Sequence, residues 1–103
     1  MDKAILEQKI ISVLKTVYDP EIPVDIYEMG MIYEIKISDE GNVYIKMTLT
    51  SPACPVAESL PQEVKDRISS IEETGHVYIA LVWDPPWDKD MMTEEAKLEL
   101  GFF

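Results

Sequence analysis

The stretch 47–58 contains the residues whose types and order could do chemistry. Its alternating apolar and threonine side chains indicate a strand, which Pro52 ends because proline has no N–H to give a neighbouring strand. Pro55 suits the first turn of a helix, where its missing donor costs nothing. The pattern therefore places Cys54, the only cysteine, at or beside a helix start, where exposed N–H groups and the helix dipole favour a thiolate.

The size of that electrostatic effect decides which chemistry the thiol suits. A charge at a helix end gains roughly 0.3–1 kcal/mol, which is less than one pKa unit. From an ordinary pKa of about 8.5, the thiolate fraction at pH 7 rises only from roughly 3% to about 10%, and Glu58 opposes the change. Cys54 is thus a usable metal ligand more readily than an activated nucleophile, and the alternative is a buried structural cysteine.

Length and composition limit the class of protein. The chain has 103 residues, 47% of them hydrophobic, which is enough for one domain spanning 1–103. A single cysteine excludes an internal disulfide. We find no apolar run long enough to span a bilayer and no signal peptide, so we expect a soluble cytoplasmic protein.

Charge is the second constraint on function. The formal net charge is −11, and no lysine or arginine falls between Lys15 and Lys36. The same interval contains five acidic residues: Asp19, Glu21, Asp25, Glu28 and Glu34. Binding to nucleic acid through phosphate neutralisation is therefore excluded. The acidity either keeps the protein soluble or serves metal handling or a basic protein partner.

The first thirty residues predict a helix followed by a structured loop. Asp2 can cap the helix, whose apolar stripe contains Leu6, Ile10, Val13, Leu14 and Val17. The helix should end at Asp19-Pro20, because proline pushes the preceding residue out of the α region. The segment Glu21–Gly30 has no clear period, but its apolar residues predict that it packs onto the body of the protein.

The rest of the chain predicts a hairpin, a helix, a strand and a short final helix. Met31–Ser38 and Val43–Thr50 alternate around a turn at 39–42, which is typical of a β-hairpin. A helical pattern follows to about Ile71, interrupted by Pro61. His76–Trp83 reads as a strand that is apolar on both faces and needs cover from the C-terminal tail or from a second copy of the chain, a homodimer.

These elements predict an α+β fold, a two-layer α-β-β-α-β domain with a small mixed sheet and a short C-terminal helix that Thr93 caps. The strand order beyond the hairpin cannot be read from the pattern. There is no phosphate-binding glycine loop, paired metal-binding histidine or Ser/His/Asp pattern. Cys54 and His76 would be the minimum for a cysteine-dependent enzyme, but nothing in their spacing brings them together.

Three segments of the chain form a combined signature. The first runs from Asp19 to Ile26 and continues at 29–32, the second is Thr48-Leu49-Thr50 with Cys54-Pro55, and the third is 83–87. Together they resemble the SufT/PaaD-like family of iron–sulfur cluster assembly factors. The residues from Asp90 to Gly101 also resemble the short final helix of bacterial SufT-like members. The resemblance covers nearly the whole chain, in order and at plausible spacing.

The resemblance implies a non-enzymatic accessory factor in iron–sulfur cluster assembly or delivery to client proteins. The cysteine before proline is the residue singled out in that family, which makes Cys54 a transient cluster or iron ligand, or a contact thiol. Thr50, Asp19 and Glu21 are the other matching polar positions. The implied partners are the assembly machinery and client apoproteins, with neither nucleic acid nor membrane.

Two alternatives to this reading remain open. The PaaD-like branch suggests an interaction subunit that supports a multicomponent oxygenase, and the third class is a cysteine-dependent enzyme. One thiolate cannot satisfy a cluster that usually takes four. We therefore expect a transient iron–sulfur cluster or iron, and none held stably by the isolated chain.

Overall fold

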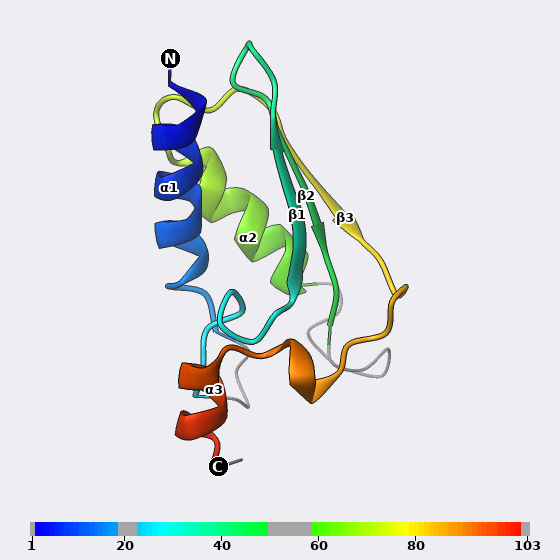
Figure 1. Cartoon of the computed structure of the whole chain (residues 1–103). Helices are drawn as coiled ribbons and strands as arrows, with labels where there is room; N and C mark the ends of the chain where they lie inside the picture. Colours follow the sequence, from blue (N-terminus) through cyan, green and yellow to red (C-terminus); the bar gives the residue numbers. More distant parts are fainter. Residues whose placement is uncertain (1, 19–22, 50–58, 102–103) are drawn as a thin grey trace.

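The structure, a computed structural model, describes residues 2–18, 23–49 and 59–101 (Figure 1). The sheet has the strand order β1-β2-β3, in which β2 pairs antiparallel with β1 and parallel with β3. This confirms the predicted α+β fold with a mixed sheet. The elements in chain order are α1 (Lys3–Leu14), β1 (Ile32–Ile37), β2 (Val43–Met47), α2 (Ser59–Ser69), β3 (Val77–Leu81), the 3-10 helix η1 (Lys89–Met91) and α3 (Glu94–Glu99).

The helices α1 and α2 lie on one face of the sheet, so the fold has two layers (Figure 1). On β2 the alternation is complete: Val43, Ile45 and Met47 are buried, whereas Tyr44 and Lys46 are exposed. The buried side chains meet the apolar stripe of each helix, which supplies Leu6, Ile10 and Leu14 from α1 and Leu60, Val64 and Ile68 from α2. No helix among the described residues has the length and apolar content needed to cross a membrane.

The first helix begins as the sequence predicts but ends earlier. The Asp2 side chain caps α1 by accepting hydrogen bonds from the N–H groups of Ala4 and Ile5. The helix stops at Leu14 rather than at Asp19-Pro20, so the predicted end is wrong. Val17 is still buried, but its N–H donates to the Leu14 carbonyl three residues back, which tightens the chain out of the α-helix.

The hairpin forms at the predicted place, with one correction to its alternation. Ile35 pairs with Ile45 and Ile37 with Val43, but the register shifts between Ile32 and Glu34. Ile32 therefore pairs with Met47 and packs against the core, instead of sharing a face with Glu34 as strict alternation predicts. A β-bulge inserts one residue and reverses the alternation beyond it.

The turn of the hairpin also accepts hydrogen bonds from the residues just before β3. The N–H of His76 donates to Oδ1 of Asn42 at 2.9 Å, and the N–H of Gly75 donates to the carbonyl of Gly41 at 2.9 Å. The Val43 N–H then donates to the His76 carbonyl at 2.8 Å, which begins the parallel pairing of β2 and β3. The turn thus sets where the third strand begins.

The described part of α2 runs from Ser59 to Ser69 and contains Pro61. The predicted helical pattern therefore forms an α-helix on both sides of this proline. The residues from Val56 to Glu58 lie outside the described part of the chain.

The C-terminal segment packs below the sheet in Figure 1 and not over its open face. Its contacts go to the loop before β1 and to the start of β1. Trp87 Nε1 donates to the Met29 carbonyl at 2.8 Å, and the Tyr33 hydroxyl donates to the Pro85 carbonyl at 2.7 Å. Thr93 caps α3 as predicted, and its N–H donates to the Glu28 carbonyl at 2.9 Å. The tail therefore does not give β3 the cover that the sequence predicts for it, within the described residues.

The C-terminal segment also passes close to Gly30. Its φ is +77°, and a Cβ atom at this position would lie 2.2 Å from the carbonyl oxygen of Met91. Glycine is therefore required both by the backbone conformation and by the approach of the C-terminal segment.

We expect Gly30→Ala to lower the free energy of unfolding by roughly 3 kcal/mol or more, because left-handed strain and steric overlap add. Gly101→Ala is the matched control: its φ is also +77°, but nothing lies within 4 Å of the added Cβ. It should cost only about 1 kcal/mol. Urea titrations of the two variants measure the difference, and equal losses would show that the approach of Met91 contributes nothing.

Candidate functional site

The four residues that the sequence predicts for the site are Cys54, Thr50, Asp19 and Glu21. They lie in the segments 19–22 and 50–58, outside the described residues. Their predicted roles therefore stay predictions. What the structure does describe is the set of residues on either side of both segments.

The flanks of both segments lie at one end of the molecule. The carboxyl end of β2 and the amino end of α2, which bound 50–58, are at the lower end of Figure 1, together with α3. The N–H of Thr48, which is fully buried, donates to the Met31 carbonyl at 2.8 Å and ties this end of β2 to the loop before β1. Tyr18 and Asp25, on either side of 19–22, form a β-bridge.

His76 lies at the other end of the sheet. It precedes β3, its carbonyl accepts from Val43 at the start of β2, and its ring is tilted against that of Tyr78 at 6.1 Å. The described flanks of Cys54 are at the far end of the same two parallel strands. The structure thus does not bring the flanks of Cys54 and His76 together.

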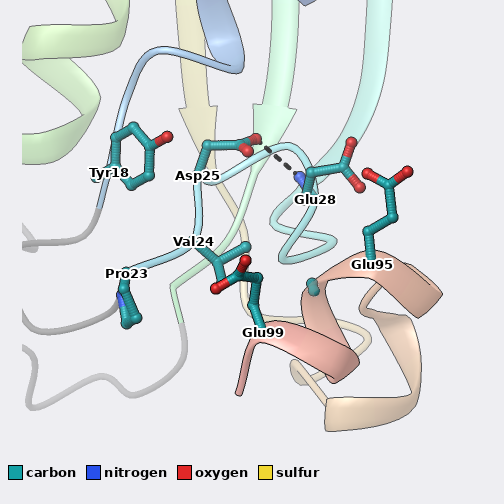
Figure 2. A pocket seen from close by; sticks show the side chains of 8 residues that line it. Tyr18, Pro23, Val24, Asp25, Glu28, Glu95 and Glu99 are labelled. Carbon is teal, nitrogen blue, oxygen red and sulfur yellow. Dashed lines mark hydrogen bonds between the residues drawn. The ribbon is translucent and has the colours of Figure 1, made fainter. Parts of the chain in front are cut away.

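A hollow that we call the acidic groove opens beside Tyr18 and Pro23, the residues on either side of segment 19–22 (Figure 2). Its volume is about 220 Å³, and it lies between the loop before β1 and α3. Figure 2 shows carboxylates reaching it from both sides, Asp25 and Glu28 from the loop and Glu95 and Glu99 from α3. The lining residues are Tyr18, Pro23, Val24, Asp25, Glu28, Glu95, Ala96 and Glu99.

Asp25 holds the loop wall of the groove in shape. Its side chain is almost fully buried, and Oδ1 accepts hydrogen bonds from the N–H groups of Tyr27 at 3.1 Å and Glu28 at 3.0 Å. Short polar side chains stabilise turns in this way, by accepting from their own backbone two and three residues on. The dashed line in Figure 2 marks the second of these bonds.

Glu28 joins three parts of the chain. Its Oε1 lies 3.6 Å from Nζ of Lys15, just beyond α1, and its Oε2 accepts a hydrogen bond from the hydroxyl of Thr93. Lys15 also lies over the Tyr27 ring, 5.5 Å from its centroid. The Glu28 side chain is only 17% exposed, so these contacts are screened less than those of a surface pair. Glu28 thereby fixes α3 against the loop.

The chemistry of the groove is that of an anionic surface. Clustered carboxylates attract cations and basic side chains. Within residues 2–18, 23–49 and 59–101, however, no three His, Cys, Asp or Glu side chains are arranged so that they could hold a metal ion. The groove is therefore a feature of the candidate end of the molecule and not, by its described residues, a metal centre.

The sequence identifies only one wall of this groove. The absence of lysine and arginine between Lys15 and Lys36 marks Asp25 and Glu28 as unusual. In the sequence, Glu95 is an ordinary acidic residue in the first turn of a short helix, and Glu99 is an ordinary polar residue near its end. Their position depends on how the C-terminal segment packs on the loop, and no local pattern encodes that contact.

Comparison with known proteins defines the class. Residues 7–81 match a family model described as iron–sulfur cluster assembly protein. In fold, a solved domain of unknown function from Bacillus anthracis is similar to this chain, with a TM-score of 0.90, 36% identity, and coverage of 97% of this chain and 95% of that one. The chain therefore belongs to the iron–sulfur cluster assembly protein family.

Relatives narrow the assignment within that family. An iron–sulfur protein maturation auxiliary factor of Porphyromonas gingivalis is 47% identical over 93% of this chain and 91% of its own. The iron–sulfur protein maturation auxiliary factor SufT of Staphylococcus aureus is 41% identical over 82% of this chain and 97% of its own. The predicted SufT-like resemblance is thus confirmed. An iron–sulfur cluster carrier protein of Mycobacterium leprae is 30% identical, but this chain spans only 23% of its length.

The contact between Thr93 and Glu28 can be measured by a double-mutant cycle. Thr93→Val removes the cap of α3 and the hydroxyl donor, and we expect a loss of roughly 1–2 kcal/mol. Glu28→Gln keeps the shape but removes the charge, and the two substitutions should couple by about 1 kcal/mol because their side chains share one hydrogen bond. Chemical denaturation of the four proteins checks this, and additive losses would mean that the side-chain contact is energetically silent.

Proposed function

We propose that this protein is a cytoplasmic accessory factor that helps to assemble iron–sulfur clusters or to deliver them to client apoproteins, without itself being an enzyme. The observation that carries the proposal is the family match across residues 7–81. The names of its relatives, maturation auxiliary factors and cluster carriers, support an accessory role.

Cys54 is the residue that we propose to touch the cargo. It is the only thiol of the chain, and its position before Pro55 favours the thiolate that soft iron ligation needs. We assign it the role of transient cluster or iron ligand, or of a contact thiol toward the donor or the client. Thr50, Asp19 and Glu21 would act beside it as polar groups around the same exchange.

The presence of a single thiol limits how this protein could handle a cluster. A cluster usually takes four protein ligands, mostly cysteine, and this chain can supply one. A cluster that passes through this protein is therefore shared with a donor, a client, a second subunit or a small thiol. This makes the protein a transfer or docking intermediate rather than a store.

The acidic groove supports a docking role for the surface beside segment 19–22. The acidic groove lies between the loop that follows residue 22 and α3, so a partner that approaches this end meets a negative surface. Electrostatic attraction of that kind raises association rates and favours basic partners. We infer that the donor or client presents lysine or arginine side chains there.

Capture of partners from a lysate separates this function from the alternatives. The proposal predicts apoproteins that contain iron–sulfur clusters and components of the assembly machinery. Recovery of the subunits of a single oxygenase alone would favour the PaaD-like alternative. Fast reaction of Cys54 with simple electrophiles would favour a cysteine-dependent enzyme.

We expect Cys54→Ala to abolish function while the fold is kept. The loss of one sulfur atom should cost at most about 1–2 kcal/mol even at a buried site, yet the variant should fail to restore the activity of a cluster-dependent enzyme in a deletion strain. Ser51→Ala, which removes one polar atom from the same segment, is the control and should restore it. Full complementation by Cys54→Ala would remove Cys54 from the site.

Cluster binding by the isolated chain gives an independent test. The protein purified in air should be colourless, and anaerobic reconstitution should load well under one cluster per chain, dependent on Cys54 and on an added small thiol, because the chain lacks the remaining soft ligands. Iron and sulfide analysis with visible absorption measures the loading. A stoichiometric, stable cluster on a strictly monomeric chain without added thiol would contradict the shared-cluster mode.

A further inference from the structure

The two edges of the sheet differ in how they are protected. An edge strand presents unpaired backbone groups, which proteins usually protect with charges, proline or a bulge. The edge strand β1 has the bulge after Ile32 and the charged pair Glu34 and Lys36, 3.1 Å apart. Hydrogen bonding from Lys36 also lowers the pKa of Glu34 below its usual value, so this edge stays charged over a wide pH range.

The other edge strand, β3, has none of these devices. From residue 77 to residue 83 the chain contains no charge, no proline and no glycine, in a protein whose net charge is −11. Within the described residues nothing pairs with the outer edge of β3. Hollows lie on both sides of the strand, one against Pro61 and Lys65 of α2 and one on the open face against Tyr44 and Lys46.

The hydrogen bonds of the sheet tell which backbone groups face outward. The Val82 N–H donates to the Met47 carbonyl, and the His76 carbonyl accepts from Val43, so even-numbered residues of this strand face β2. Because the direction alternates along a strand, the N–H and C=O groups of Val77, Ile79 and Leu81 point away from the sheet. These are the groups that an added strand would use.

We propose that β3 pairs antiparallel with β3 of a second copy of this chain, about a two-fold axis at Ala80. This register places Ile79 opposite the partner's Leu81 and Val77 opposite the partner's Trp83, so every outward-facing group finds a complementary one. In this register the uncharged residues 77–83 of one copy lie opposite the same residues of the other copy.

Hydrogen-bonding and size complementarity identify the second copy as the occupant. His76 at one end of the run comes opposite the partner's Asp84 at the other end, which places an imidazole donor opposite a carboxylate acceptor twice by symmetry. Ala80, the smallest side chain of the strand, lies on the axis, where two chains approach most closely. The exposed Tyr78, stacked on Tyr44 with a ring separation of 5.0 Å, lies against the partner's Val82.

The pairing also explains why association stops at two chains. Joining the β3 edges gives one sheet of six strands, whose two free edges are both β1. Those edges have the bulge and the charged pair, so no further chain adds. The interface is isologous and closed, and it leaves the acidic groove of each copy at the outside, away from β3.

Amide hydrogen exchange tests the pairing strand by strand. In the full chain, the amides of Val77, Ile79 and Leu81 should exchange fast at micromolar concentration and become protected at millimolar concentration. The amides of Tyr78, Ala80 and Val82, which face β2, should be protected at both and serve as the internal control. A chain that stays monomeric over this range, as judged by sedimentation, overturns the proposal, and so does a dimer in which the outward amides remain unprotected.

Substitutions test the same interface by charge. Ala80→Glu should raise the dimer dissociation constant roughly tenfold or more, because it places two like charges opposite each other. Lys36→Gln, on the protected edge, lowers the net charge by the same one unit and should leave the constant within about twofold. Equal weakening by both variants would show that net charge, and not this edge, governs association.

Cross-linking tests the register. In a Cys54→Ala background, Ala80→Cys should form a disulfide-linked dimer under mild oxidation, because the two residues face each other across the axis. Lys46→Cys, on the same face but on the central strand, should not. Absence of the first cross-link, or equal cross-linking of both, would refute the pairing.

Discussion

The close approach of Gly30 to the carbonyl of Met91 is the constraint on which the candidate end of the molecule depends. It brings the C-terminal segment against the loop before β1, where Trp87 and Thr93 add hydrogen bonds to Met29 and Glu28. A side chain at residue 30 would push this segment away and strain the contacts that hold α3 as one wall of the acidic groove. A backbone requirement at one glycine thus determines the electrostatics of a surface that no glycine lines.

The parts of the fold that the sequence predicts are those that local chemistry determines. Asp2 and Thr93 cap their helices because a short polar side chain is the best acceptor for free N–H groups. The hairpin forms where two alternating runs meet a turn. The pairing of β2 with β3 and the bulge after Ile32 were not predictable, because each depends on contacts between separate strands. The early end of α1 was missed because its apolar stripe continues to Val17, while the backbone already tightens there into a bond of Val17 to Leu14.

The candidate site also has a part that local sequence predicts and a part that depends on distant contacts. Cys54 and its neighbours could be singled out from residue types, order and family resemblance, and the family itself is confirmed. The groove could not, because Glu95 and Glu99 acquire their meaning only when α3 lies against Asp25 and Glu28. The proposed function uses both parts, a thiol for chemical contact and a charged surface for selecting the partner.

The turn at 38–42 has a consequence for how the sequence can vary. Exposed turns usually tolerate insertions and deletions. Here Asn42 holds the N–H of His76, so the turn also measures where β3 begins. Asn42 directly precedes β2, so this hydrogen bond ties the start of β3 to the start of β2. A slip of β3 by one residue against β2 would bring Tyr78 and Ala80 into the core while Ile79 turns outward. One side chain of the turn thus acts against a slip that would exchange the two faces of the third strand.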